Sequence, residues 1–141
     1  VTTLAFVLYH LALLPVIAAL PGPAWAKASG FAWIAFDNVL EVLALFGEGA
    51  DLVVPLRWGI HLAMATWILG ASGAQWGALR WIGFGVALAV TGVTFAGPFL
   101  PDRALVPQTL GPAALLFIVW IALAGFRLAR TQPASISAPP A

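Results

Sequence analysis

Ionisable and amide side chains interrupt three otherwise apolar segments of this sequence. Such groups cost several kcal/mol in a hydrocarbon environment, so they usually face a protein interior, pair with one another and mark functional sites. We therefore treat them as the candidate site and call them the polar cluster. Its six members are His10, Asp37, Asn38, Glu41, Arg57 and His61.

The spacing of four of these residues predicts two pairs across a helical hairpin. Asp37 and Glu41 are four residues apart, as are Arg57 and His61, so each pair shares one helix face. Counted at ~1.5 Å per residue from the outer helix ends, Glu41 lies at ~9 Å and Arg57 at ~8 Å. On the same count Asp37 lies at ~15 Å and His61 at ~14 Å. We predict a Glu41 to Arg57 ion pair and, deeper, an Asp37 to His61 hydrogen bond.

Three functions are compatible with the polar cluster. The first is a structural lock that fixes the arrangement of the hairpin without chemistry. The second is a proton or ion path through Asp37, Glu41 and His61. The third is a b-type haem or other tetrapyrrole, with His10 and His61 as axial ligands and Asp37 orienting the His61 ring. His10 lies ~10 Å below the same surface, which is the level of the cluster.

The sequence lacks the residues that several other kinds of site require. The sequence has no cysteine, which excludes disulfides, thiolate-ligated clusters and cysteine nucleophiles. It has no HExxH, GxSxG, Walker-type or GxGxxG motif within a suitable context. The serines at 29, 72, 135 and 137 fall in predicted connectors or the tail, away from both histidines. We expect no catalytic residues and no metal site, and hence no enzyme.

The composition explains where these residues must lie. Of 141 residues, 62% are hydrophobic and 8% are charged, with a mean hydropathy of +1.02. Soluble domains are about 25% charged, so this chain has too little charge to cover a globular surface in water. A nucleic-acid binder would need a basic face, and a disordered chain would need low hydrophobicity. The composition indicates a membrane protein whose net charge of +1 identifies no partner.

Five apolar segments approach the length of about 20 residues that a membrane-spanning helix needs. The connectors between them are short and rich in Pro and Gly, and the polar residues 131–141 are predicted to be disordered. We predict an all-α integral membrane protein, a five-helix transmembrane bundle that forms one domain over residues 1–130. The predicted spans are 3–20, 31–47, 52–70, 79–97 and 110–127.

The few cations predict the orientation, because Lys and Arg are retained in short cytoplasmic loops. Five spans would put one set of cations on the side of the C-terminus, which we therefore place in the cytoplasm. This set is Lys27, Arg80, Arg127 and Arg130. The opposite side would carry Glu48, Asp51, Asp102 and Arg103.

The start of the sequence leaves two alternatives open. Val1 fits a GTG start codon, and it also fits a longer protein with further helices upstream. The first apolar stretch lacks a basic region before it, so we interpret it as a membrane helix and not as a cleaved leader.

Tryptophans and small residues add two structural expectations. Trp25, Trp33, Trp76 and Trp81 fall near the predicted cytoplasmic boundary, as an interfacial aromatic belt would. Small residues in the fourth segment allow close helix packing, either inside the bundle or against another subunit or a second copy. These packing residues are Gly83, Gly85, Ala89, Gly92 and Ala96.

Three segments resemble successive blocks of a known group of proteins. The segments are FDNVLEVLALFG, QWGALRWIGFGVALAVTG and LLFIVWIALAGFRLAR, within residues 31–130. They resemble uncharacterised bacterial multi-pass inner-membrane proteins that share a domain of unknown function. Glu41 matches the buried acid of that group, and Trp76 with Arg80 matches its turn between helices. The resemblance implies a fold and a bacterial inner-membrane location but no activity, and its members are longer at the N-terminus.

The combined expectation is a small multi-pass membrane protein with a structural, accessory or interaction role. Its expected partners are the lipid bilayer and other membrane subunits or itself, with no nucleic acid. Haem b remains the cofactor to test, through His10 and His61.

Overall fold

A computed structural model describes residues 2–47, 50–99 and 105–131 of the chain. These residues form five α-helices and one 3-10 turn, and the described residues include no strand, so the predicted all-helical fold is confirmed. The elements are α1 (Thr2–Ala19), α2 (Ala24–Leu45), α3 (Ala50–Gly73), α4 (Ala78–Ala96), η1 (Gly97–Phe99) and α5 (Leu105–Thr131).

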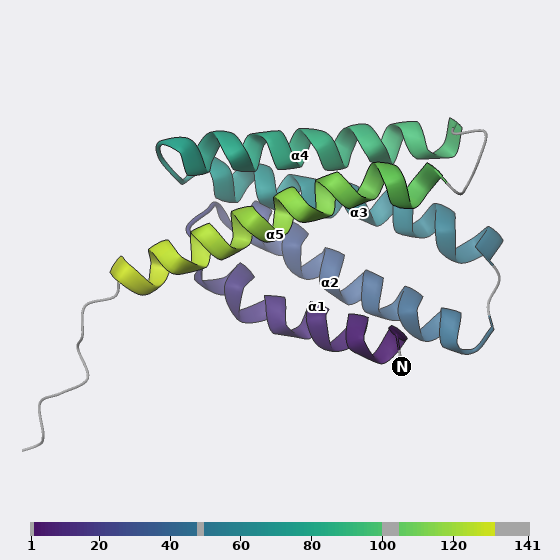
Figure 1. Cartoon of the computed structure of the whole chain (residues 1–141). Coiled ribbons are helices and arrows are strands. Elements are labelled where there is room, and N and C mark those ends of the chain that lie inside the picture. Colours follow the sequence, from purple (N-terminus) through teal and green to yellow (C-terminus); the bar gives the residue numbers. More distant parts are fainter. Residues whose placement is uncertain (1, 48–49, 100–104, 132–141) are drawn as a thin grey trace, which may run out of the picture.

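The helices form an up-and-down bundle in which neighbours along the chain run antiparallel (Figure 1). Contacts join α1 to α2, α2 to α3, α3 to α4 and α4 to α5. The C-terminal ends of α1, α3 and α5 lie at the same end of the bundle (Figure 1). At this end α1 connects to α2 and α3 connects to α4. The short connectors require this arrangement, since they leave no room for a crossover.

Four helices are long and apolar enough to cross a membrane: α2, α3, α4 and α5. The 22 residues of α2 extend ~33 Å at 1.5 Å per residue, against a hydrocarbon thickness of ~30 Å. The first helix is apolar but shorter over Leu4–Ala19. The described residues thus contain five helices, of which four have the length of the predicted membrane spans and α1 is shorter.

Two helices begin earlier than the sequence predicts. α2 begins at Ala24 and not at residue 31. Pro23 is the N-cap residue, so the helix starts directly after the prolines at 21 and 23. The Pro23 carbonyl accepts hydrogen bonds from the backbone N–H groups of Ala26 and Lys27. α5 begins at Leu105 and not at residue 110, since Pro107 falls in a first turn whose N–H groups have no intrahelical partner in any case.

An aromatic core fills the space between α2, α3 and α5. Trp33 stacks on Trp67 with ring centroids 6.0 Å apart, and Trp67 meets the edge of Trp120 at 5.9 Å. Phe117 lies perpendicular to Trp33 at 6.0 Å. Each of these four side chains is almost fully buried.

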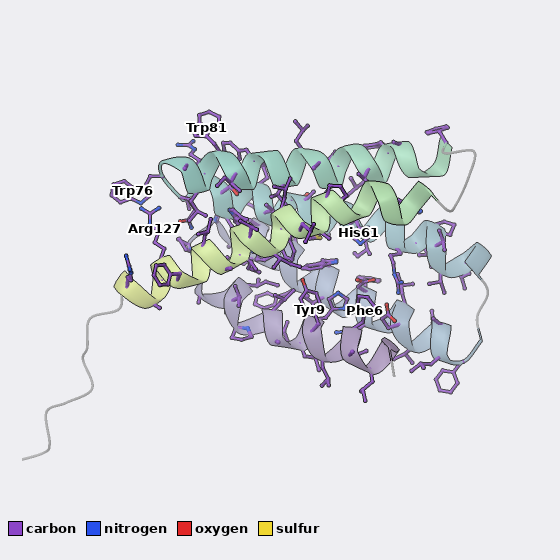
Figure 2. The ribbon with its side chains drawn as sticks, in the orientation of Figure 1. Phe6, Tyr9, His61, Trp76, Trp81 and Arg127 are labelled. Atoms are coloured by element: carbon purple, nitrogen blue, oxygen red, sulfur yellow. The ribbon has the colours of Figure 1, made fainter. Side chains whose placement is uncertain are left out.

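The predicted aromatic belt is wrong for Trp33, which is 2% exposed. Because α2 begins at Ala24, Trp33 lies ~14 Å along the helix at 1.5 Å per residue, well inside the bundle. Trp25, Trp76 and Trp81 are exposed. Trp76 and Trp81 lie at the α3 to α4 end of the bundle (Figure 2).

The small residues of α4 divide between two faces. Gly83 is buried, and a Cβ there would meet the side chains of Ser72 and Trp120. Gly85 and Gly92 have no neighbour within 4 Å of the Cβ position among the described residues. Ala96 is exposed and Ala89 is half-buried. The prediction of internal packing therefore holds for Gly83, while Gly85 and Gly92 face outward.

Some predictions fall outside the described residues. These are the disordered tail over 132–141 and the outer charges Glu48, Asp102 and Arg103; the side chain of Asp51 is likewise not described.

We expect Gly83→Ala to lower the free energy of unfolding by about 1–3 kcal/mol, because the new methyl group would force Ser72 and Trp120 apart. Thermal unfolding of the purified chain in detergent, followed by circular dichroism, measures the change. The matched control is Gly92→Ala on the same helix, which should be neutral or slightly stabilising. Equal effects of the two substitutions would contradict this packing.

Candidate functional site

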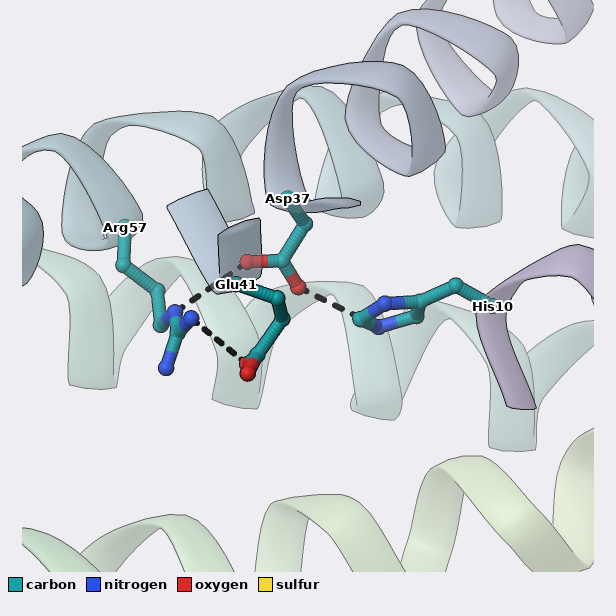
Figure 3. A network of polar contacts seen from close by, with 4 residues as sticks. All are labelled: His10, Asp37, Glu41 and Arg57. Atoms are coloured by element: carbon teal, nitrogen blue, oxygen red, sulfur yellow. Dashed lines mark hydrogen bonds and ion pairs between the residues drawn. The ribbon is translucent and has the colours of Figure 1, made fainter. Parts of the chain in front are cut away.

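Arg57 on α3 joins two carboxylates of α2 (Figure 3). Its Nε donates a hydrogen bond to Asp37 Oδ1 at 3.1 Å, and its Nη2 donates to Glu41 Oε1 at 2.6 Å. The two acids are one helical turn apart, so both face α3. The predicted Glu41 to Arg57 ion pair is confirmed.

His10 brings a third helix into the site. Its Nε2 lies 3.2 Å from Asp37 Oδ2, an ion pair when the imidazole is protonated. The imidazole ring also meets the edge of Trp33, with centroids 5.5 Å apart at 77°. Asp37 therefore connects α1, α2 and α3, and we call the four residues His10, Asp37, Glu41 and Arg57 the polar network.

The predicted Asp37 to His61 hydrogen bond is wrong. Both oxygens of Asp37 are engaged, one by Arg57 and the other by His10. The prediction compared only the depths of the Cα atoms along the two helices. The arginine side chain is long enough to contact both Glu41 and Asp37, which lies one turn deeper. His61 instead lies edge-on to Trp58, with ring centroids 6.4 Å apart.

Asn38 is also outside the polar network. It is half-buried, and its Oδ1 has no hydrogen-bond partner among the described residues. Asn38 follows Asp37 directly, so a helix turns it away from the face that Asp37 and Glu41 share.

Burial makes the charges of the network interdependent. The side chains of His10, Asp37 and Glu41 are 5%, 6% and 9% exposed, whereas that of Arg57 is 34% exposed. With neutral imidazole the network has a formal charge of −1, and protonation of His10 makes it neutral. A buried charge without a partner is strongly destabilising, so both carboxylates depend on Arg57.

A partly open cavity of about 380 Å³ lies beside the network. Helices α1, α2 and α3 contribute its polar groups, including both histidines, while α4 and α5 contribute apolar groups. The lining residues include Phe6, Tyr9, Trp33, Val90, Ala114 and Phe117 in addition to the network and His61. Phe6 and Tyr9 on α1 and His61 on α3 lie in the half of the bundle nearer the N-terminus (Figure 2).

The aromatic wall of this cavity was not predicted from the sequence. Trp33, Asp37 and Glu41 follow one another at four-residue spacing, which places them on one helix face. That spacing could have identified Trp33 as part of the site. Phe117 and Ala114 have no such signal, because only the tertiary packing of α5 brings them to α2.

The described residues include no group of three or more His, Cys, Asp or Glu side chains arranged to hold a metal ion. Asp37 is already engaged by His10 and Arg57, and Glu41 by Arg57. The geometry is therefore that of a connected ion-pair network beside a largely apolar cavity.

We expect Asp37→Asn to destabilise the protein more than Glu41→Gln, by about 2–3 kcal/mol against about 1–2 kcal/mol. Asp37 contacts Arg57 and His10 on two other helices, whereas Glu41 contacts Arg57 alone. Unfolding by sodium dodecyl sulfate in mild detergent, followed by tryptophan fluorescence, gives the two free energies.

The compensated triple variant Asp37→Asn, Glu41→Leu, Arg57→Met is the control. This variant removes both carboxylates and the guanidinium together, so with neutral imidazole no charge is left unpaired. Its stability should return to within about 1 kcal/mol of wild type. A triple variant no more stable than Asp37→Asn alone would argue against charge interdependence.

No protein-family model matches this chain, and neither does any curated protein or any solved structure. The resemblance to bacterial inner-membrane proteins therefore stays a prediction, and the functional argument depends on the site itself.

Proposed function

We propose that the chain is a multi-pass integral membrane protein that acts without catalytic machinery, as a structural or accessory component of a bacterial inner membrane. The observation that carries the proposal is the buried polar network, in which Asp37 connects three helices. Lipid provides no hydrophobic drive between helices, so polar contacts of this kind fix how they assemble.

The surface of the bundle supports a lipid environment. Large apolar side chains point outward from several helices, among them Leu88, Phe95 and Leu115 at 74%, 62% and 66% exposure. Contiguous apolar surface of this kind is unfavourable in water and ordinary in a bilayer. The 18 residues of α1 would extend ~27 Å, which tilt or slight local thinning of the bilayer accommodates.

The cations support a cytoplasmic C-terminus. Lys27 donates a hydrogen bond from Nζ to the Ala18 carbonyl at 2.7 Å, at the α1 to α2 end. Arg127 donates to the Trp76 carbonyl at 3.3 Å and lies 5.4 Å from the Trp76 ring centroid, at the same end (Figure 2). Basic residues with exposed tryptophans are typical of the cytoplasmic interface.

We expect single cysteines at the two ends to react from opposite sides of the membrane. The chain contains no cysteine, so Ala74→Cys and Phe46→Cys each introduce one exposed thiol. A membrane-impermeant maleimide should label Ala74→Cys only in inside-out vesicles and Phe46→Cys only in right-side-out vesicles. Labelling of both variants from one side would contradict the proposed topology.

The outer face of α4 is the proposed contact with another membrane subunit or a second copy. Gly85 and Gly92 are seven residues apart on one helix face and have open space beyond them within the described structure. Small residues at such a face allow the backbone of another helix to approach closely.

Haem binding is the second candidate, because His10 and His61 line the same cavity. The fit is poor as the side chains stand. His10 Nε2 faces Asp37 at 3.2 Å, so the imidazole would have to turn before this nitrogen could bind iron. A proton path has less support still, because α4 and α5 line the cavity with apolar residues.

We expect the ultraviolet-visible spectrum of the chain purified in mild detergent to show no band above the tryptophan absorption, before or after dithionite. A Soret band with a sharpened reduced α-band, lost in His10→Ala or His61→Ala, would instead establish haem and replace the structural role. Asn38→Ala serves as the control, since Asn38 has no contact with the polar network.

A further inference from the structure

The cavity beside the polar network has the size and lining of a small-molecule site. Ligand pockets usually have volumes of about 300–1,000 Å³, mostly apolar walls and a few placed polar groups. This cavity has about 380 Å³ and fits that description. It is a property of the fold, so an inference about its ligand does not depend on the orientation or the structural role proposed above.

The guanidinium of Arg57 is the charged donor in the wall, and the imidazole of His61 and the hydroxyl of Tyr9 can donate or accept. Trp33 lines the cavity, but its indole nitrogen is buried away from the open space and has no partner among the described residues. Arg57 uses Nε and Nη2 for the two carboxylates, and no hydrogen bond from Nη1 is found in the described structure. A guanidinium can only donate, so the group that completes Nη1 must be an acceptor.

The charges of the network disfavour an ionic ligand. An anion would enter beside a network whose formal charge is −1 with neutral histidines, or zero once His10 is protonated. A cation would first meet Arg57, whose side chain is 34% exposed, because the carboxylates of Asp37 and Glu41 are 6% and 9% exposed. A neutral acceptor, such as a carbonyl oxygen, avoids both penalties.

The aromatic walls favour a flat ligand. Trp33 and Phe117 both line the cavity, with their rings perpendicular at 87° and centroids 6.0 Å apart. Tyr9 lines it from α1. Planar rings gain stacked and edge-on contacts from such walls beyond the burial of their area.

We propose that this cavity binds a neutral planar ring that bears carbonyl oxygens, a compound of the quinone class, with Arg57 donating a hydrogen bond to one of those oxygens. The ring lies among the aromatic side chains of α1, α2 and α5. The polar network then has a second role, since it holds the guanidinium in place for the ligand.

The test titrates decylubiquinone, a benzoquinone with an alkyl tail, into the full chain in lipid nanodiscs, with empty nanodiscs to subtract partitioning into lipid. Saturable binding is expected. Ala114→Phe, which places a ring at the cavity wall, should weaken binding at least about tenfold. Ala122→Phe is the matched control on α5, because Ala122 is also exposed but does not line the cavity. Melting temperatures of both variants check that they fold.

Two further ligands test the chemistry. The O-methylated reduced form of decylubiquinone keeps the ring and tail but lacks carbonyl oxygens, and it should bind about tenfold more weakly. The tail-free benzoquinone separates the two sources of the ligand. Equal affinity would indicate a soluble aromatic carbonyl compound, and loss of affinity would indicate a membrane quinone.

Three results would overturn the proposal. The first is binding that does not saturate above that of empty nanodiscs. The second is equal binding by Ala114→Phe and Ala122→Phe. The third is stronger displacement of the quinone by benzoate or by an alkylammonium ion than by the tail-free benzoquinone, which would assign the cavity to an ionic ligand.

Discussion

The pairing of one guanidinium with two carboxylates is the interaction on which the arrangement of this bundle depends. Arg57 contacts Asp37 and Glu41 from the neighbouring helix, and His10 reaches the remaining oxygen of Asp37. Removing Arg57 would leave two buried carboxylates without compensation, which costs far more than the pairing contributes. The helices α1, α2 and α3 are therefore held in one register by an electrostatic requirement, not by apolar contact alone.

Aromatic packing also holds the helices together, next to the polar network. Trp33 contacts His10 on one side and Trp67 and Phe117 on the other, so the same residue belongs to the polar site and to the core. Through Phe117 the packing extends to α5, which closes one wall of the cavity. Gly83 permits the close approach of α4 to Ser72 and Trp120. The site is thus formed by side chains that helices α1, α2, α3 and α5 bring together.

The same bundle presents two different surfaces to its surroundings. Its sides expose large apolar residues such as Leu88, and one end collects exposed tryptophans with basic residues. That end has Arg127 against Trp76. The cavity lies instead in the half that contains Phe6, Tyr9 and His61 (Figure 2). A ligand at that site and a partner helix on the outer face of α4 would occupy separate parts of the molecule.

The sequence by itself determined the helices, their number and their antiparallel order, because apolar length and short connectors allow few alternatives. It also determined that Glu41 pairs with Arg57, since four-residue spacing and equal depth require only helix geometry. Tertiary structure alone decided that Asp37 pairs with Arg57 and His10 and not with His61. Side-chain reach and the position of α1 against α2 are set by packing, which one-dimensional spacing does not contain. For the same reason the burial of Trp33 and the closure of the cavity by Phe117 emerged only in the folded bundle.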